Sequence, residues 1–268
     1  MAMNKVTVVM AEYNTDERYL RQAIQSVLDQ TYYNFEFIIV DDGGVNDLVS
    51  IVRGFNDERL KIISNGGNKG FVYSLNNGIS HAVGEYIVRM DTDDIIEKDR
   101  IAILYDFINK HPQYEVVSSR AMEFSGNIKY GIIGTTGEKK RKDVMRGDTP
   151  VHAAAIVKKS AFEDIGGYKE NYTRAEDLVL WCDMLLAGKR LYVLNDVLYF
   201  YRVNKADYSK RTLRHRKGEI TARLHYYPKL KAGPIEYMRI VKSIVAGILP
   251  TNMIQAYRNK FVVNKEDL

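Results

Sequence analysis

The segment "YIVRMDTDD" (residues 86–94) is a short, mostly apolar run that ends abruptly in three carboxylates. Three earlier segments have the same form: "VTVVM" (6–10) leads into "AEYN", "FEFIIV" (35–40) into "DDGG", and "LKIIS" (60–64) into "NGGNKG". Short runs rich in β-branched residues are typical of strands buried on both faces of a sheet. The four segments therefore predict four buried strands, each followed by polar or glycine-rich residues.

Helical patterns lie between these strands. Residues 16–30 repeat apolar side chains at helical spacing, with Thr15 as the expected cap. The pattern after "NGGNKG" predicts a helix with Phe71 and Val83 on its buried side, and a further helix follows the aspartates, with Asp94 as its expected cap. This alternation predicts an α/β fold with an open, twisted, mostly parallel sheet flanked by helices, whose ligands bind at the carboxyl ends of the strands.

The middle of the chain is less regular. Residues 119–150 are polar and basic, and we expect an excursion that lies over the edge of the sheet. Beyond it, the patterns predict a strand in "HAAAIVKKS" (152–160), a helix over 174–188, and two strands in "RLYVL" (190–194) and "VLYFYRV" (197–203).

The composition is typical of a soluble globular protein, since 46% of the 268 residues are hydrophobic and 27% are charged. No apolar run approaches the roughly 20 residues of a membrane-spanning helix, and the first residues lack a signal-peptide pattern. The single cysteine, Cys182, lies beside Trp181 in an apolar helical pattern and is expected in the core. A lone cysteine forms no internal disulfide, which favours a reducing, cytoplasmic location.

Charge divides the chain in two. Residues 1–204 have 25 Lys and Arg against 29 Asp and Glu, a net −4, whereas residues 205–268 have 14 against 5, a net +9. The second part contains amphipathic helical patterns interrupted by Pro234 and Pro250. One interpretation is a helical appendage packed on the sheet domain; the other is attachment to an anionic membrane surface, on the inner face of the membrane. Nucleic acid is not an expected partner, because no recognition module is present.

The acidic clusters suggest a site for a nucleotide. Asp91 and Asp93 can hold a hard divalent cation, Mg²⁺ or Mn²⁺, that also binds a diphosphate. Asp42, after the second strand, can accept hydrogen bonds from a ribose or a base. Neither common glycine-rich phosphate loop is present. Glu176 and Asp177 open a predicted helix; they either stabilise its amino terminus or act as a general base for a hydroxyl.

Together these motifs resemble the family 2 glycosyltransferases, nucleotide-sugar-dependent enzymes of the GT-A fold. The matching segments are "VTVVMAEYNTDERYLRQAIQSVLDQTYYNFEFIIVDDGG", "NKGFVYSLNNGI", "GEYIVRMDTDD", "GGYKENYTRAEDLVLW" and "VLYFYR". The resemblance spans residues 5 to about 204. It implies a catalytic domain over 1–204, with a nucleotide-binding half over about 1–95 and an acceptor half over about 96–204, followed by the basic helical region 205–268.

The resemblance also implies roles for individual residues. The residues implied to bind the nucleotide-sugar are Ala11, Glu12, Tyr13, Asp42, Asn68, Lys69, Asp91, Thr92 and Asp93, with Asp93 as the main metal ligand and Asp91 beside it. Asp177 would be the general base, with Glu176 orienting the acceptor. A looser match places Arg202 and Ser209 near the diphosphate and His152 near the acceptor.

The expected activity is transfer of a sugar from a nucleoside-diphosphate donor, a UDP-sugar foremost, to a hydroxyl of a glycan or lipid-linked acceptor in cell-surface polysaccharide synthesis. In-line attack implies inversion at the anomeric carbon. The QxxRW motif of processive members is absent, which favours a single addition per encounter. Two alternatives stay open: a sugar nucleotidyltransferase, and a catalytically degenerate module that binds glycan or membrane.

Overall fold

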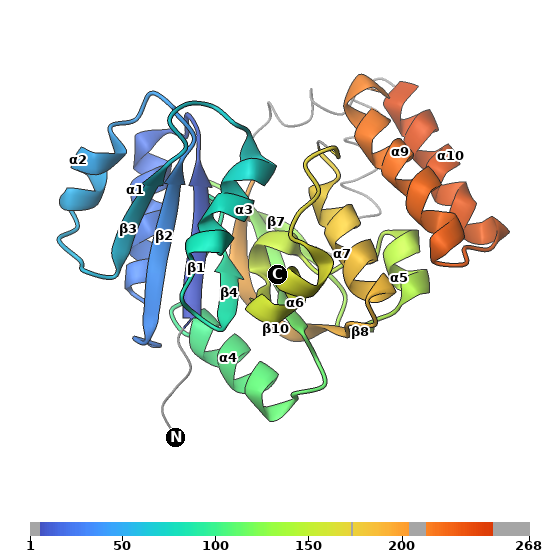
Figure 1. The fold of residues 1–268 in the computed structure, drawn as a ribbon, viewed down its shortest axis with the longest axis horizontal. Coiled ribbons are helices and arrows are strands. Elements are labelled where there is room, and N and C mark those ends of the chain that lie inside the picture. The colour runs from blue at the N-terminus through green and yellow to red at the C-terminus, as the bar shows by residue number, and fades with distance from the viewer. Residues whose placement is uncertain (1–5, 173, 204–212, 249–268) are drawn as a thin grey trace.

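The chain folds into one ten-stranded sheet with helices on both faces (Figure 1). The computed structural model describes residues 6–172, 174–203 and 213–248. The strand order is β3-β2-β1-β4-β9-β6-β10-β5, with β7 paired to β6 and β8 to β10. The strands are β1 (Val6–Glu12), β2 (Phe35–Asp41), β3 (Leu60–Ser64), β4 (Tyr86–Arg89), β5 (Ile95–Ile96), β6 (Val116–Ser125), β7 (Ile128–Ile133), β8 (Gly137–Lys139), β9 (Ile156–Lys158) and β10 (Leu191–Arg202).

The four strands predicted from the first hundred residues are present, but only three are buried; β3 is partly exposed because it lies at the edge of the sheet. β1 pairs in parallel with β2 on one side and with β4 on the other, and β2 pairs in parallel with β3. Val6 stands opposite both Phe35 and Tyr86, so the three strands begin at the same level and run in the same direction, although β4 ends opposite Val9, three residues before β1 ends. The polar segments that follow these strands therefore share one edge of the sheet.

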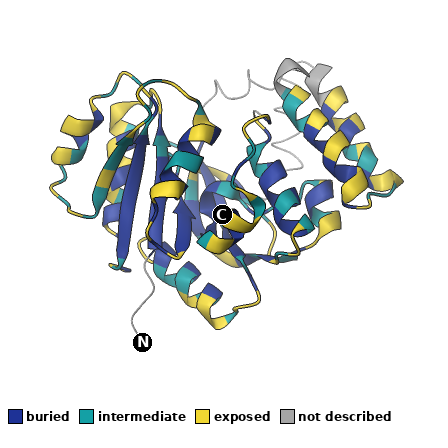
Figure 2. Cartoon of the chain, viewed as in Figure 1, coloured by how far each residue is buried: buried dark blue, intermediate teal, exposed yellow. Residues whose placement is uncertain are grey.

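Helices pack on each face of the sheet and produce two hydrophobic cores (Figure 2). One core contains α1, α2 and α4; the other contains α3, α5, α6, α7, α9 and α10. The helices are α1 (Glu17–Leu28), α2 (Leu48–Arg53), α3 (Phe71–His81), α4 (Arg100–Lys110), α5 (Arg141–Arg146), the 3₁₀ turn η1 (His152–Ala154), α6 (Lys159–Ile165), α7 (Glu176–Leu186), α9 (Leu213–Lys229) and α10 (Pro234–Ile248). Trp181 and Cys182 of α7 are buried in the second core, as expected.

Two details of the predicted helices are wrong. The cap of α1 is Asp16, whose side chain accepts a hydrogen bond from the Arg18 N–H. The predicted cap, Thr15, lies one residue before it. On α3 the buried face contains Val72 rather than Phe71, and Val83 lies beyond the end of the helix, where it is 61% exposed. Phe71 is 37% exposed because its ring packs over the guanidinium of Arg89 at the edge of the sheet, at 5.1 Å.

The predicted excursion over residues 119–150 is also wrong. β6 lies between β9 and β10, inside the sheet, and β7 forms a hairpin with it. The polar composition concealed this strand, because Ser118, Ser119 and Glu123 are buried within it. Residues 152–160 divide into η1, the antiparallel strand β9 and the start of α6, while the two strands expected over 190–203 form the single strand β10, with register shifts near Val197.

The predicted helical region at the carboxyl end contains α9 and α10, which pack against each other. Pro234 begins α10 instead of interrupting it, and Pro228 lies in the last turn of α9; Pro250 is outside the described residues. α9 packs on α7, and a salt bridge of 2.8 Å from Arg146 to Glu236 joins α5 to α10. None of the helices in the described ranges has the length and apolar character needed to cross a bilayer.

Candidate active site

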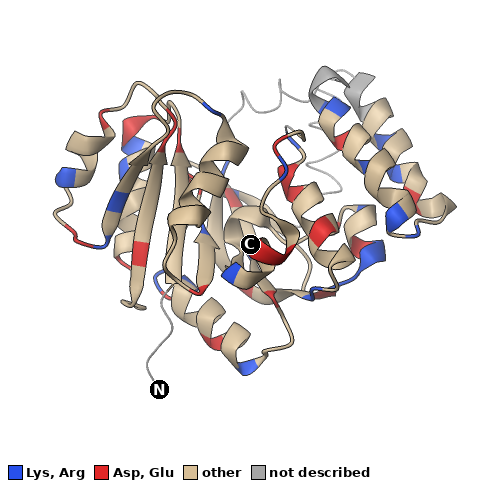
Figure 3. Cartoon of the chain, in the orientation of Figure 1, with Lys and Arg blue, Asp and Glu red and all other residues tan. Residues whose placement is uncertain are grey.

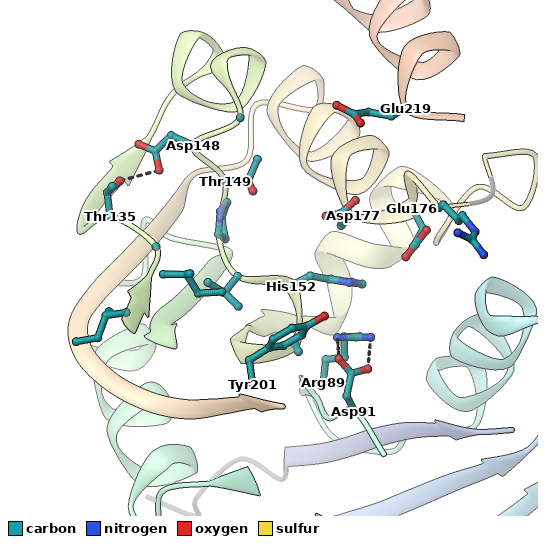
Figure 4. A pocket seen from close by; sticks show the side chains of 18 of the residues that line it. Arg89, Asp91, Thr135, Asp148, Thr149, His152, Glu176, Asp177, Tyr201 and Glu219 are labelled. Atoms are coloured by element: carbon teal, nitrogen blue, oxygen red, sulfur yellow. Dashed lines mark hydrogen bonds and ion pairs between the residues drawn. The ribbon is translucent and has the colours of Figure 1, made fainter. Parts of the chain in front are cut away.

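A cleft of about 990 Å³ opens beyond the carboxyl end of β4 (Figure 4). One wall comes from the end of β4 and the loop after it, with Arg89 and Asp91. The opposite wall comes from the amino terminus of α7, with Glu176 and Asp177, and from Glu219 of α9. The strand–turn–helix segment from β7 to η1 closes the third side. Four segments far apart in the sequence therefore place carboxylates around one space.

Asp91 is paired with Arg89 inside this cleft. Two hydrogen bonds join the groups, from Nη2 to Oδ1 at 2.5 Å and from Nη1 to Oδ2 at 3.0 Å. Burial acts to lower the pKa of Arg89, but the charge and hydrogen bonds of Asp91, together with Tyr168 and Tyr199, outweigh burial and the pKa is raised. The negative charge of Asp91 is thus already balanced by a cation that belongs to the protein.

Asp94 has a structural position rather than the predicted capping role. Its buried carboxylate accepts hydrogen bonds from the Tyr199 hydroxyl at 2.8 Å and from the Arg202 N–H at 2.6 Å, whereas α4 begins later, after Asp99. Burial, and then the charges of Asp91 and Asp93, raise the pKa of Asp94 well above its usual value. Asp94 therefore attaches residues 91–94, which we call the acidic loop, to β10.

Asp93 and Thr92 lie on the part-exposed side of the same loop. The Arg202 Nε donates to the main-chain oxygen of Asp93 at 2.6 Å, and the Thr15 hydroxyl donates to the Thr92 hydroxyl at 2.6 Å. Both ends of the loop are thereby fixed, to β10 on one side and to the segment after β1 on the other.

The guanidinium of Arg202 makes its contacts with other residues of the protein. It is 7% exposed, its Nη2 donates to Gln22 Oε1 at 2.9 Å, and its guanidinium lies over the Tyr19 ring at 4.0 Å. These contacts place Arg202 behind the acidic loop, as a support for Asp93. Ser209, the other residue predicted near the diphosphate, is outside the described residues.

Asp42 organises the loop between β3 and α3. Its buried carboxylate accepts hydrogen bonds from the N–H groups of Lys69 and Gly70 and from the Asn65 amide. Asn68 and Lys69 are exposed on this loop. Lys69 also lines a smaller pocket of about 310 Å³ that includes Glu176, so the predicted nucleotide loop reaches the wall that contains the candidate base.

Glu12 is buried at the end of β1. Its Oε1 accepts hydrogen bonds from the Thr15 N–H at 3.0 Å and the Asn46 amide at 2.8 Å, while Oε2 has no hydrogen-bond partner among the described residues. Ala11 is half-buried before it, and Tyr13 is 50% exposed after it. Glu12 therefore holds together the loops after β1 and β2.

Glu176 and Asp177 form the first turn of α7. The Leu178 N–H donates to Asp177 Oδ1 at 2.6 Å. Burial raises the pKa of the Asp177 carboxyl, and burial followed by the charge of Asp177 raises the pKa of Glu176. A carboxylate with a raised pKa accepts a proton more readily, which is the property a general base needs.

His152 lies between the two walls of the cleft (Figure 4). Its Nε2 shares a hydrogen bond of 2.7 Å with the Tyr168 hydroxyl, and its ring meets Trp181 edge to face at 5.8 Å. Burial, together with the charge of Arg89, holds the pKa of His152 well below its usual value. The ring is therefore neutral and acts as a polar group, not as a cation.

The cleft brings together Asp91, His152, Glu176 and Asp177 of the predicted residues. The other predicted residues within the described ranges are not among those that line it. Ala11 and Glu12 end β1, and Tyr13, Asp42, Asn68 and Lys69 follow β1, β2 and β3 along the same edge of the sheet, while Thr92 and Asp93 lie in the loop after β4 and Arg202 ends β10.

Sequence reasoning missed three groups of the cleft: Arg89, Arg174 and the pair Arg216 and Glu219. Arg89 belonged to an apolar strand pattern, and the α9 residues belonged to a pattern typical of a solvated helix face.

The acidic loop can hold a divalent cation only with few protein ligands. No group of three or more His, Cys, Asp or Glu within the described ranges is arranged to bind a metal. Mg²⁺ and Mn²⁺ sites at phosphates often use one or two carboxylates, with the phosphate oxygens and water completing the coordination. Because Asp91 is paired and Asp94 is buried, the loop fits such a site through Asp93.

Residues 7–166 match the family model described as glycosyl transferase family 2. A Bacillus subtilis protein assigned as a glycosyltransferase, EpsE, is 30% identical over 271 residues, 98% of this chain and 96% of the relative. The Escherichia coli UDP-Gal:alpha-D-GlcNAc-diphosphoundecaprenol beta-1,3-galactosyltransferase is 29% identical over 274 residues, 97% of each chain.

Solved structures share the fold. S. aureus TarS 1–349 in complex with UDP-GlcNAc superposes with a TM-score of 0.69 at 17% identity, over 96% of this chain and 75% of that one. Mannosyltransferase PcManGT from Pyrobaculum calidifontis, in complex with GDP-Man and Mn²⁺, gives 0.66 at 19% identity, over 98% and 81%. This likeness confirms the predicted GT-A architecture.

Proposed function

The chain belongs to glycosyltransferase family 2, and from that membership we propose that it transfers a sugar from a UDP-sugar, with inversion, to a hydroxyl of a lipid-linked or glycan acceptor in cell-surface polysaccharide synthesis. The observation that supports this most directly is the cleft that Asp91 and Asp177 share from opposite walls. One wall suits a donor diphosphate and the other an acceptor hydroxyl.

In this proposal Asp177 removes the proton from the acceptor hydroxyl, since it is a half-buried carboxylate with a raised pKa that faces the cleft. Glu176 orients the acceptor beside it. The hydroxyl oxygen attacks the anomeric carbon as the bond to the diphosphate breaks, and the diphosphate leaves on the side of the acidic loop. A divalent metal held by Asp93 would stabilise the charge that develops on that leaving group. Attack opposite the leaving group inverts the anomeric configuration.

The donor loops follow β1, β2 and β3 in this proposal. Asp42 positions the loop so that Asn68 and Lys69 can close over the base, and Glu12 positions Tyr13 and the residues around it. Arg202 supports Asp93 from behind. The support from relatives is that one acts with UDP-Gal on a diphosphoundecaprenol-linked sugar, and that solved neighbours bind UDP-GlcNAc or GDP-Man. A single addition per encounter is part of the proposal.

Binding of the donor tests the proposed chemistry before any acceptor is known. We expect UDP-sugars to raise the melting temperature in the presence of Mn²⁺ and to do so weakly in EDTA, because a metal held by Asp93 would neutralise part of the diphosphate charge. Screening UDP-, GDP- and dTDP-sugars identifies the donor, and NMR of the product then reports the anomeric configuration. Equal donor binding with and without Mn²⁺, combined with no transfer and no donor hydrolysis, would contradict an enzyme and favour a degenerate binding module.

We also propose that α10 attaches the protein to an anionic membrane surface. Five apolar side chains of α10 are exposed, at spacings that place them along one side of the helix: Ile235, Met238, Val241, Ile244 and Val245. Lys229, Lys231 and Lys242 are exposed nearby. Exposed apolar residues beside cations are typical of helices that lie in the interface of anionic bilayers.

The membrane proposal predicts that Met238→Asp with Val241→Asp weakens binding to vesicles containing phosphatidylglycerol by about tenfold or more, because two apolar side chains can no longer enter the bilayer. Co-sedimentation measures this directly. Val49→Asp on α2 is a matched control, since Val49 is also an exposed apolar residue, 46% accessible. Equal binding of all three proteins, or equal binding to phosphatidylcholine alone, would contradict the proposal.

A further inference from the structure

Arginines gather beside the candidate base, on the side of the cleft formed by α9 and α10, where Figure 3 marks the positions of basic residues along both helices. A pocket of about 240 Å³ lies there, next to the main cleft. Its charged lining consists of Arg174, Arg223, Arg239, Asp177 and Glu219. We call this the arginine pocket. Asp177 lines both the arginine pocket and the main cleft, so the two spaces meet at the candidate base.

Positive charge is in excess around the arginine pocket. Glu219 is shared between two arginines, with Arg223 at 2.9 Å and Arg216 at 3.7 Å, and it also accepts a hydrogen bond from Ser243. Arg239 has a buried Nε with no hydrogen-bond partner among the described residues. Burial, and then repulsion from Arg223, lower the pKa of Arg239. A bound anion would relieve the repulsion between these guanidinium groups.

The backbone keeps space for these arginines. Gly147 has a φ of +83°, and a Cβ at this position would stand 2.5 Å from Nη2 of Arg239, so a larger residue would displace the guanidinium. Arg174 also has a positive φ, of 62°, which is uncommon for a residue with a side chain. Arg223 is fixed by hydrogen bonds to Tyr227 and to the main-chain oxygen of Met145. Arg223 and Arg239 are therefore held at the pocket by the fold, while Arg174 lines the pocket from an exposed position.

We propose that the arginine pocket binds a phosphate group of the acceptor, attached to the sugar whose hydroxyl Asp177 deprotonates. This inference rests on the proposed function, which it deepens by naming the acceptor class. Guanidinium groups bind phosphate oxygens through paired hydrogen bonds. An acceptor that extends from the arginine pocket into the cleft presents its sugar to Asp177 and its phosphate to Arg174 and Arg239. The enzyme then discriminates against neutral glycans.

Binding of inorganic pyrophosphate tests the pocket without turnover. In EDTA, where the donor diphosphate site lacks its metal, calorimetry should detect pyrophosphate binding that Arg239→Gln and Arg174→Gln each weaken by about tenfold, through loss of a charge-assisted contact. Arg53→Gln on α2 removes an exposed charge of the same kind and should leave the affinity unchanged. Arg174 is exposed, so its variant does not depend on the stability of α10.

The outcomes separate the arginine pocket from the donor site. If Asp93→Asn keeps the affinity for pyrophosphate while Arg239→Gln loses it, the anion binds where we propose. If Asp93→Asn loses the affinity, or if Arg53→Gln weakens it as much as the pocket variants do, the proposal is overturned. Unchanged affinity in both pocket variants overturns it as well.

Three acceptor analogues then test specificity: an alkyl-diphosphate N-acetylglucosamine, a glycerol phosphodiester oligomer, and a neutral alkyl N-acetylglucosaminide. We expect Arg239→Gln to raise the acceptor KM for whichever phosphate-bearing analogue is used, with the donor KM unchanged, and to leave the neutral analogue unaffected. Comparison of transfer to the first two analogues distinguishes a lipid-linked diphosphate acceptor from a phosphate-containing polymer. Preference for the neutral analogue would contradict the proposed phosphate site but not the proposed transferase activity. Pyrophosphate binding without any sugar transfer would contradict the transferase activity but not the phosphate site.

Discussion

Asp177→Asn should lower the rate of sugar transfer by about a thousandfold while donor affinity stays near that of the wild type. Asparagine keeps the size and hydrogen-bonding capacity of the side chain, including acceptance from the Leu178 N–H, but it cannot take a proton from a hydroxyl. Transfer is measured with radiolabelled donor, and donor affinity by melting temperature with Mn²⁺. Asp164→Asn, at an exposed ion pair with Lys189, is the control that should leave transfer unchanged.

The pH dependence of the wild type gives a second, independent readout for Asp177. Its pKa lies above the ordinary value of 3.8 because the carboxyl is buried. Below that raised pKa the carboxyl is protonated and cannot act as a base, so transfer should fall as the pH decreases through it, and the variant should lose this limb. A variant that loses donor binding along with transfer would indicate that Asp177 is structural.

Local patterns were sufficient to predict the part of the fold that holds the donor loops. β1, β2 and β4 are short apolar runs buried on both faces, β3 is a partly buried edge strand, and each of the four ends at a polar segment. Parallel pairing then requires the four polar segments to share an edge, and the structure has them there. The prediction worked because neighbours in sequence determine where a buried strand ends.

Long-range packing could not be predicted in the same way. β6 contains buried Ser118 and Ser119, whose hydroxyls are satisfied by main-chain oxygens, so a buried strand looked like a polar excursion. Glu219 and Arg216 reach the cleft because α9 packs on α7, across more than thirty residues of chain. Neither feature has a local signal, because the compensating partners come from distant segments.

The four residues of the acidic loop also have contacts with distant residues that the sequence could not show. Charge repulsion among Asp91, Asp93 and Asp94 predicted a cation, but the sequence could not show that Arg89 already neutralises Asp91 or that Tyr199 receives Asp94. Strand alternation alone places Arg89 and Asp91 on the same side of the chain, and this was the signal available for their pairing. The structure thereby separates three neighbouring carboxylates into different environments.

That separation predicts different outcomes for two aspartates of one motif. Asp93→Asn should abolish the part of the donor-induced rise in melting temperature that depends on Mn²⁺, and should lower transfer by about a hundredfold or more, because the metal loses its protein carboxylate. The free energy of unfolding without ligand should stay near that of the wild type, since asparagine retains the main-chain oxygen that Arg202 holds.

Asp91→Asn is the matched comparison, and we expect it to lower the free energy of unfolding while the Mn²⁺-dependent stabilisation by donor is retained. It leaves Arg89 without its charge partner, and breaking a buried ion pair typically costs about 3–5 kcal/mol. The Asp91 side chain retains 24% exposure, so water can partly replace the carboxylate and we expect about 2 kcal/mol of destabilisation in urea unfolding. If instead Asp91→Asn alone abolished the Mn²⁺-dependent stabilisation and Asp93→Asn did not, Asp91 would be the metal ligand and the pair with Arg89 would have to open when donor binds.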